Sequence, residues 1–335
     1  MAGNSNFLDS QRNKEDEFYT KLDMIENELK YYRTHFKDKT VFCNCDDPKE
    51  SNFWKYFAMN FEFLGLKKLI ATHYDAEKPT YKLELTRDTN GDGVVNEKDI
   101  VETPFTQNGD FRSPECVEIL KEADIIVTNP PFSLFKEYFN QLIEYDKKFL
   151  IIGRVSAAGL KDVFPLIFEN KVWMGKTSGH FWFSVPSYYQ EKKTDFKIDE
   201  NGQKWRRMGN ICWFTNLDFE ERYEDITLFK TYSPDKYPHY DNYDAIEVKN
   251  VADLPMDYYD ICGVPFSFLT KWNPRQFEII GKSDRLNSSG IRTKKYTIDD
   301  TKRYNDLNVG CVLKSDNDYK SLTSRLFIRR IKNED

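Results

Sequence analysis

The four consecutive residues Asn129, Pro130, Pro131 and Phe132 have side chains suited to chemistry on a planar amino-aromatic ring. They follow an apolar, β-branched run, residues 123–128, that predicts a short buried strand. A proline has no amide hydrogen for a strand ladder, so this strand must end in a rigid bend. The bend presents an amide oxygen from Asn129 and a flat apolar ring from Phe132.

An exocyclic amino group such as that of adenine is a poor nucleophile, because its lone pair is delocalised into the ring. Acceptors on Asn129 and on the Pro130 carbonyl would bind both amino hydrogens and direct the lone pair at a methyl donor. Phe132 would stack on the base, a contact worth about 1–3 kcal/mol in single-strand binders, and the stiff turn would supply positioning. The structural alternative is a strand followed by a proline turn and a helix start.

Residues 124–132 look like motif IV of the amino-methyltransferases, and residues 123–152 closely resemble the EcoRI-type adenine-specific DNA methyltransferases. The resemblance implies a class I, Rossmann-like α/β fold with a mainly parallel sheet, helices on both faces and a less regular C-terminal DNA-recognition region. It also implies an S-adenosylmethionine-dependent enzyme that flips an adenine out of double-stranded DNA and methylates its N6 nitrogen. Such an enzyme is the modification partner of a type II restriction–modification system. The stretches that carry the likeness elsewhere are residues 16–20, 43–48, 109–113, 263–265 and 273–274.

Two other functions remain compatible with the motif itself. An Asn-Pro-Pro-Phe turn can hold any planar amide or amine, so the acceptor could instead be adenine in RNA or a glutamine side chain of a protein. The chain could also be a catalytically silent DNA-binding protein on the same scaffold, which the intact motif at residues 129–132 disfavours.

The resemblance makes Tyr19, Thr20, Asp110 and Phe111 contacts of the methyl donor, and the acidic residues after the first two predicted strands are placed to bind it as well. The expected cofactor contacts are Tyr19, Thr20, Asp46, Asp47, Asp75, Asp110 and Phe111. Carboxylates at the carboxyl ends of strands suit an ammonium group or ribose hydroxyls. For Thr20 a helix cap, and for Asp75 a plain turn, are the alternatives. No Gly-x-Gly follows the predicted first strand, residues 40–45, where an ordinary methyltransferase has a glycine-rich loop.

Alternating strands and helices before about residue 175 predict the parallel α/β sheet. The expected division is a flexible N-terminus (1–14), a catalytic and cofactor-binding domain (15–178), and a region with the remaining strands and the DNA-recognition surface (179–335). Predicted strands in the second of these are residues 40–45, 68–72, 123–128 and 148–152. Predicted helices are residues 15–36, 53–64 and 135–142, and one more helix is opened by Ser113 as cap with Pro114 in its first turn.

Residues 88–99 have the spacing of a calcium-binding loop. The candidate ligands are Asp88, Asn90, Asp92, Asn96 and Asp99, with Gly93 at the sixth position. Our hypothesis is a structural calcium site on a hairpin insertion, residues 81–103, with a polar hairpin tip as the alternative. The flanking helices of an EF-hand are not evident, and methyl transfer should not need the ion.

Charge is distributed unevenly along the 335 residues. The whole chain has a net charge of −6, but residues 270–335 hold 15 Lys and Arg against 9 Asp and Glu. The C-terminal region is therefore the expected phosphate-facing surface, with a solvated charged face as the alternative. A basic, aromatic loop at residues 204–207 is a second candidate. The expected DNA contacts are Lys204, Arg206, Arg207, Lys271, Arg275, Arg292, Lys294 and Lys295.

Six scattered cysteines and no leader sequence predict a reducing cytoplasm. No apolar run approaches about 18 residues, so a membrane span is not expected. The resemblance fits a monomer that is paired functionally with a restriction endonuclease.

Overall fold

The chain divides into two compact units, described here separately. The sheet unit comprises residues up to Ala157 and Val172–Phe219, and the C-terminal unit comprises Ala158–Lys171 and residues from Glu220 onward. The structure is a computed structural model. It describes residues 18–45, 47–76, 79–315 and 318–332. In this described part no helix has the length and apolar character that a membrane span needs.

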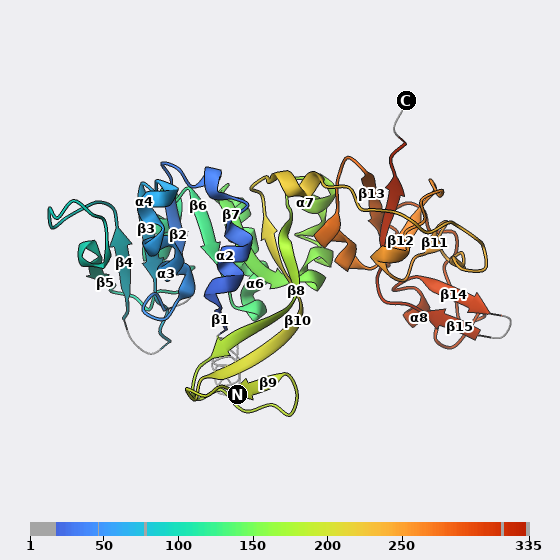
Figure 1. The fold of residues 1–335 in the computed structure, drawn as a ribbon. Helices are drawn as coiled ribbons and strands as arrows, with labels where there is room; N and C mark the ends of the chain where they lie inside the picture. The colour runs from blue at the N-terminus through green and yellow to red at the C-terminus, as the bar shows by residue number, and fades with distance from the viewer. Residues whose placement is uncertain (1–17, 46, 77–78, 316–317, 333–335) are drawn as a thin grey trace. The chain divides into compact units, whose positions relative to one another are not determined.

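Within the described residues, ten strands form the sheet of the first unit (Figure 1). Their bounds are β1 Tyr19–Thr20, β2 Thr40–Cys43, β3 Lys68–Thr72, β4 Tyr81–Leu85, β5 Val101–Pro104, β6 Ile125–Thr128, β7 Lys148–Arg154, β8 Trp173–Val185, β9 Phe196–Ile198 and β10 Lys204–Thr215. The order is β1-β8-β10-β7-β6-β2-β3-β4-β5, with β9 paired to β10.

The central strands β7, β6, β2 and β3 are parallel, whereas the pairs on both flanks are antiparallel. The α/β prediction is confirmed, with a parallel centre inside a mixed sheet. Parallel neighbours need long crossovers, while the outer pairs β4–β5 and β8–β10 are antiparallel neighbours joined by hairpin-type links. The predicted hairpin at residues 81–103 is the β4–β5 pair, at one edge of the sheet.

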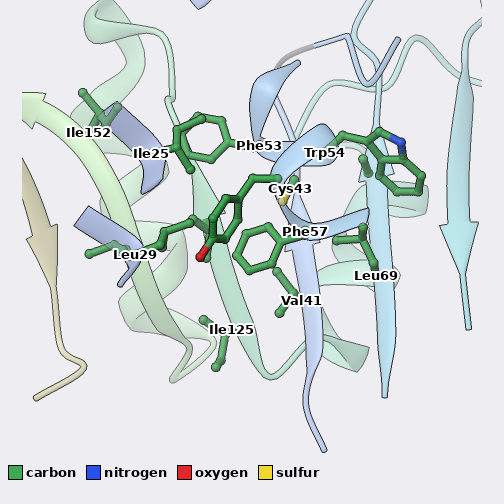
Figure 2. Packing of buried hydrophobic residues seen from close by; sticks show 14 of the residues in the cluster. Ile25, Leu29, Val41, Cys43, Phe53, Trp54, Phe57, Leu69, Ile125 and Ile152 are labelled. Atoms are coloured by element: carbon green, nitrogen blue, oxygen red, sulfur yellow. The ribbon is translucent and has the colours of Figure 1, made fainter. Parts of the chain in front are cut away.

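Helices cover both faces of this sheet because its central strands are apolar on both sides. Val41 of β2 packs with Phe57 in the core cluster beneath two of the helices (Figure 2). Its neighbour Phe42 is fully buried on the opposite face, as strand alternation requires. On that face Phe139 meets Phe149 of β7 with ring centroids 5.7 Å apart. The helices are α2 Leu22–Leu29, α3 Asn52–Met59, α4 Phe61–Leu64, α5 Pro114–Glu122 and α6 Phe135–Glu144, with 3₁₀ turns η1 Arg33–His35, η2 Glu97–Asp99, η3 Phe132–Leu134 and η4 Val155–Gly159.

Serine side chains cap the starts of two predicted helices, and of these the Ser113 cap was expected from the sequence. Ser51 accepts a hydrogen bond from the Phe53 amide at 3.2 Å and begins α3. Ser113 accepts from the Cys116 amide at 3.3 Å, and Pro114 occupies the first helical position of α5. These serines satisfy amide groups that a helix N-terminus otherwise leaves unpaired.

Residues 179–186 and 209–216 have the sequence pattern of strands, and the observed strands β8 and β10 begin six and five residues earlier. The expected boundary at residues 178/179 falls inside β8, and residues 204–207 belong to β10 rather than to a loop. Only residues 211–215 of β10 pair with β7, while residues 204–206 pair with β8 and β9. The basic segment is therefore part of a four-stranded extension beyond β7, formed by β1, β8, β10 and β9. Residues 204–209 of β10 are partly exposed there, and the apolar alternation is weak.

The C-terminal unit contains a four-stranded sheet in the order β11-β12-β16-β13. A buried ion pair joins Arg325 to Glu247, with Nη2 and Oε1 2.8 Å apart, and the Tyr240 hydroxyl donates to the same carboxylate. The bounds in this unit are β11 Ile246–Glu247, β12 Cys262–Val264, β13 Phe277–Lys282, β14 Val312–Ser315, β15 Asp318–Ser321, β16 Leu326–Arg330, α7 Phe164–Phe168, α8 Tyr304–Leu307, η5 Glu220–Tyr223, η6 Val251–Asp253 and η7 Phe266–Lys271.

Candidate active site

The bend after β6 holds Asn129 in one orientation. The side chain is 5% exposed, and its Nδ2 lies 2.6 Å from the Phe18 carbonyl oxygen. A carbonyl can only accept, so the amide nitrogen must be the end that faces it. The other end, Oδ1, is buried and has no hydrogen-bond partner among the described residues. An unpaired buried acceptor is uncommon and typically costs about 1–3 kcal/mol, so this oxygen is set up for a ligand.

Two hydrogen bonds to Asn44, the residue after β2, connect the end of β2 to the end of β6 and to α6. The Thr128 hydroxyl donates to the Asn44 carbonyl, and the Tyr138 hydroxyl of α6 donates to its side-chain oxygen. Complete burial raises the pKa of Tyr138 well above its ordinary value, so the phenol stays protonated and donates. These bonds hold the C-terminal ends of β2 and β6 and the helix α6 next to Asn129.

The ring of Phe132 lies among three other side chains. Phe18 stacks on it with centroids 5.7 Å apart and planes at 27°, and Phe183 of β8 meets it edge to face at 6.2 Å. The Arg154 Cζ atom lies over the same ring, 5.5 Å from its centroid. Phe132 is half-buried, so an apolar planar surface remains available beside the Asn129 oxygen.

The predicted cofactor residue Asp47 lies where the loops after β2 and β3 meet. Its carboxylate accepts from the Tyr81 hydroxyl at 2.6 Å and from the Lys49 amide at 3.0 Å. Nδ1 of His73, just after β3, lies 3.8 Å from the same carboxylate. Asp46 lies outside the described residues. Asp47 therefore sits at the carboxyl edge of the parallel strands, as predicted.

The loop of residues 109–111 packs against the end of β3. Gly109 has φ +73°, and a Cβ there would lie 1.9 Å from the His73 carbonyl oxygen, so only glycine fits. The Asp75 amide donates to the Asn108 carbonyl at 2.9 Å, which joins the two loops. Asp75 and the 109–111 loop are thus brought together.

Asp110 and Phe111 already have protein partners. Arg112 binds the Asp110 carboxylate through Nε at 2.9 Å and Nη2 at 2.8 Å. Burial by itself raises the pKa of Asp110, but the hydrogen bonds from Arg112 outweigh it and hold the pKa below its ordinary value. Phe111 is buried, with its ring edge to face on Tyr138 at 5.1 Å. A nucleoside amine at Asp110 would share the carboxylate with Arg112.

Tyr19 and Thr20 form β1, directly after the Phe18 carbonyl that holds Asn129. The Thr20 carbonyl accepts from Asn52 Nδ2 at 2.7 Å, which ties β1 to the start of α3. The Thr20 hydroxyl is buried without a hydrogen-bond partner among the described residues. Neither residue caps a helix here, because Lys21 stands at the N-terminus of α2 with no side-chain cap. The capping alternative is therefore wrong.

Cys45 takes the place of the missing glycine after β2. It has φ +83°, in the left-handed region that non-glycine residues seldom adopt. Residues held in such conformations cluster at binding and catalytic sites. Nothing in the sequence marks this position, since cysteine has no preference for a positive φ.

The loop at residues 88–99 satisfies its own polar groups. Asp99 accepts from the amides of Thr89 at 2.7 Å and Asn96 at 3.0 Å, and Asp88 accepts from Gly91 and Gly93. Across the described residues, no group of three His, Cys, Asp or Glu side chains is placed to hold a metal ion. The calcium hypothesis is not supported, and the geometry is that of a self-bonded polar hairpin tip.

In the sheet unit, the residues predicted to contact DNA form hydrogen bonds or ion pairs with neighbouring residues of the β8–β10 extension. Lys204 Nζ donates to the Tyr189 carbonyl at 2.9 Å, and Arg206 donates to the Asp195 carbonyl at 3.1 Å. Arg207 lies 3.4 Å from the Asp195 carboxylate. All three are partly exposed, so they remain candidates for phosphate contacts after rearrangement.

The predicted contacts of the C-terminal unit differ in their availability. Arg292 donates to the Tyr243 hydroxyl at 2.5 Å, and Lys294 pairs with Asp300 at 2.9 Å. Three others are exposed, and no side-chain hydrogen bond or ion pair holds them among the described residues: Lys271, Arg275 and Lys295. The Arg275 guanidinium nevertheless lies over the Tyr223 ring, 4.0 Å from its centroid. Lys271 and Lys295 therefore have the most freedom to meet a phosphate, and Arg275 would have to leave the Tyr223 ring or reach the phosphate from it.

Sequence reasoning missed four residues that the structure brings to the site. Phe18 and Asn44 position the amide and the strand ends, and Arg154 and Phe183 lie on the Phe132 ring. A run of aromatic residues in β8 was the signal for Phe183. Phe18 and Asn44 lie in the stretches 16–20 and 43–48 that carry the family likeness, although no role was assigned to them, and no local pattern marks Arg154.

The chain matches the family described as "Adenine-specific methyltransferase EcoRI" over residues 6–330. The Type II methyltransferase M.EcoRI of Escherichia coli is 50% identical over 285 residues, which cover 81% of this chain and 87% of that protein. M.MpnI of Mycoplasma pneumoniae and M.MgeORF184P of Mycoplasma genitalium, both named Type II methyltransferases, are each 39% identical. Their matches cover 82% of this chain and 84% and 85% of those proteins. The donor that methyltransferases of this kind use is S-adenosylmethionine. A bend with a fixed amide acceptor and the match over nearly the whole chain agree, and this protein belongs to the EcoRI family of adenine-specific DNA methyltransferases.

Proposed function

We propose that Asn129 and Phe132 hold a target adenine that has been flipped out of double-stranded DNA, and that the methyl donor binds beside them at the carboxyl ends of β2 and β3. One observation carries this proposal: Asn129 Oδ1 is a buried acceptor without a partner among the described residues, and the Phe18 carbonyl fixes its orientation. The exocyclic amine of adenine is a donor that this oxygen can accept from.

The roles of the bend follow from its chemistry. Asn129 Oδ1 accepts one amino hydrogen and the Pro130 carbonyl accepts the other, which draws the lone pair out of conjugation with the ring. Because Nδ2 is held by Phe18, the amide cannot rotate to present its donor end. Phe132 stacks on the base and offsets part of the few kcal/mol that unstacking requires.

The residues around the strand ends fit S-adenosylmethionine. The carboxylates of Asp47, Asp75 and Asp110 suit an ammonium group and hydroxyls. The buried hydroxyl of Thr20, which has no hydrogen-bond partner among the described residues, and the Phe111 ring suit the remaining polar groups and an aromatic base. Tyr19 is the neighbour of Thr20 in β1. When bound, S-adenosylmethionine supplies a methyl group on a positively charged sulfur, which an amine nitrogen can displace.

We propose that the C-terminal unit contributes most phosphate contacts, because Lys271, Arg275 and Lys295 are exposed there. Relatives named Type II methyltransferases support a role as the modification enzyme of a type II system, with a restriction endonuclease as functional partner. We expect a monomer in the cytoplasm.

A filter assay with tritiated S-adenosylmethionine tests the acceptor. Duplex DNA, RNA and ribosomal protein are offered separately, and label is expected in DNA alone. Label in RNA or protein and none in DNA would overturn the acceptor assignment. Sequencing of DNA from cells that express the chain, with a readout of methylated adenine, then defines the recognition sequence.

Asn129→Ala tests the role of the bend. We expect methyl transfer to fall on the order of 10²–10³-fold, as for loss of one preorganised hydrogen bond, while calorimetric affinity for S-adenosylmethionine is kept. Asn201→Ala, on an exposed turn, is the matched control and should leave both unchanged. An equal loss of activity and cofactor affinity in Asn129→Ala would contradict the assigned role.

A further inference from the structure

Arg154 is a residue that the proposed reaction leaves without a role, although it lies on the acceptor-base side of the site. It is the last residue of β7, which pairs in parallel with β6, the strand that leads into Asn129. Its guanidinium carbon lies over the Phe132 ring, 5.5 Å from the centroid. The side chain is exposed, and its guanidinium has no hydrogen bond or ion pair with the described residues.

The other two groups on the Phe132 ring cannot move away easily. Phe18 is 7% exposed and Phe183 is fully buried, and both belong to the core cluster of the sheet unit. Arg154 is the exposed group among these three neighbours. A base that arrives from solvent and stacks on Phe132 therefore meets Arg154 first.

We propose that the Arg154 guanidinium covers the ring of Phe132 while no DNA is bound, and yields this position to the flipped adenine. This inference rests on the proposed function, because it takes Phe132 as the stacking surface. A guanidinium is planar and stacks on aromatic faces much as a base does. The displaced guanidinium then binds a backbone phosphate of the extruded nucleotide's strand, which its paired N–H groups fit.

The exchange has a physical rationale in both states. Without DNA, the half-buried ring of Phe132 is shielded by a side chain whose guanidinium has no acceptor among the described residues. With DNA, base stacking on the ring is stronger than an exposed cation–π contact, and a phosphate is a stronger partner for the cation than the ring. Arg154 is thus a positioning residue that favours the flipped state after the base arrives.

Two measurements of opposite sign test this role. The free nucleoside 2-aminopurine riboside is titrated by fluorescence in the absence of DNA, and Arg154→Ala should bind it several-fold more tightly because the cover is gone. A duplex with 2-aminopurine at the target adenine should bind several-fold more weakly. The slope of log affinity against log salt for this duplex should fall by about 0.9, one phosphate contact.

Controls separate a covering role from simple damage. Arg87→Ala removes an exposed arginine from the β4–β5 hairpin and should change neither affinity. Arg154→Lys should restore the salt slope, since it keeps the charge, but not the nucleoside exclusion, since an ammonium is not planar. Calorimetric affinity for S-adenosylmethionine and the melting temperature should stay at wild-type values in all three variants.

Outcomes also distinguish this inference from the proposed function. If Phe132→Ala loses methylation but Arg154→Ala binds nucleoside and duplex as wild type does, the Arg154 inference is wrong and the acceptor site stands. Weaker binding of both ligands by Arg154→Ala would indicate a structural role and also overturn the inference. Full activity of Phe132→Ala would show that Phe132 is not the stacking surface, and the proposed function would then be wrong.

Discussion

Asn129 Nδ2 donates to the backbone carbonyl of Phe18 at 2.6 Å, across 111 positions of sequence. This bond determines which end of the amide is left for the proposed acceptor base, so a residue next to β1 orients a side chain in the bend after β6. Because Phe18 also stacks on Phe132, the same residue orients both of the groups proposed to hold adenine.

Replacing Asn129 by aspartate tests this orientation. Asn129→Asp keeps an acceptor oxygen but loses the donor to the Phe18 carbonyl, which would face a carboxylate instead. We expect methyl transfer to fall as far as in Asn129→Ala, and the free energy of unfolding to drop by about 1–3 kcal/mol for the unpaired buried carbonyl. Single-turnover methylation and urea denaturation measure the two effects. Wild-type activity in Asn129→Asp would show that the Phe18 bond is dispensable.

Gly109 offers a test of the cofactor side with a matched control. Gly109→Ala introduces a Cβ 1.9 Å from the His73 carbonyl oxygen and a strained φ, so it should displace the 109–111 loop. Gly91→Ala has a similar φ, +79°, and no atom within 4 Å, so it bears the conformational strain alone, about 1–2 kcal/mol. We expect calorimetric affinity for S-adenosylmethionine to fall in Gly109→Ala only. Equal affinity for S-adenosylmethionine in both variants would show that the 109–111 loop does not contribute to cofactor binding.

Cys45 predicts an unusual order of stabilities. In a left-handed conformation, a non-glycine residue carries strain of about 1–3 kcal/mol, which glycine relieves at the expense of about 0.5–1 kcal/mol of chain entropy. Cys45→Gly should therefore be at least as stable as Cys45→Ala, which removes the sulfur but keeps the strain. Cys45→Val, β-branched at φ +83°, should be the least stable of the three. Thermal unfolding ranks them, and a glycine variant less stable than the alanine variant would exclude strain at this position.

Local chemistry in the sequence was enough to predict some elements and not others. Strand β3 was predicted at its observed bounds, Lys68–Thr72, because it is a buried apolar run with a glycine before it. The start of α5 followed from Ser113 and Pro114. The bend at Asn129 was predictable from two prolines, but its partner Phe18 was not, since that contact exists only after the sheet forms. The basic part of β10 was missed because it pairs beyond the core, where strands lose their apolar alternation.

The hydrogen bonds of Asp99 predict that the stability of the hairpin tip falls at acidic pH. Hydrogen bonds from the amides of Asn96 and Thr89 lower the pKa of Asp99 to about 2, from an ordinary 3.8. A carboxyl whose pKa is lowered by folding stabilises the folded form when ionised. Its contribution is therefore present above about pH 4 and is lost as the pH falls toward 2.

Amide hydrogen exchange at Thr89, Asn90 and Asn96 measures this contribution, because their N–H groups donate to Asp99. Protection of these amides, corrected for intrinsic exchange rates, should decline between about pH 4 and pH 2. Asp99→Asn should lower it throughout and abolish its pH dependence, because an amide can place its single acceptor oxygen toward only one side of the loop. Asp92→Asn, which alters an exposed carboxylate of the same loop, is the control and should retain the pH dependence. Protection that is independent of pH in the wild type would show that Asp99 does not hold the hairpin tip.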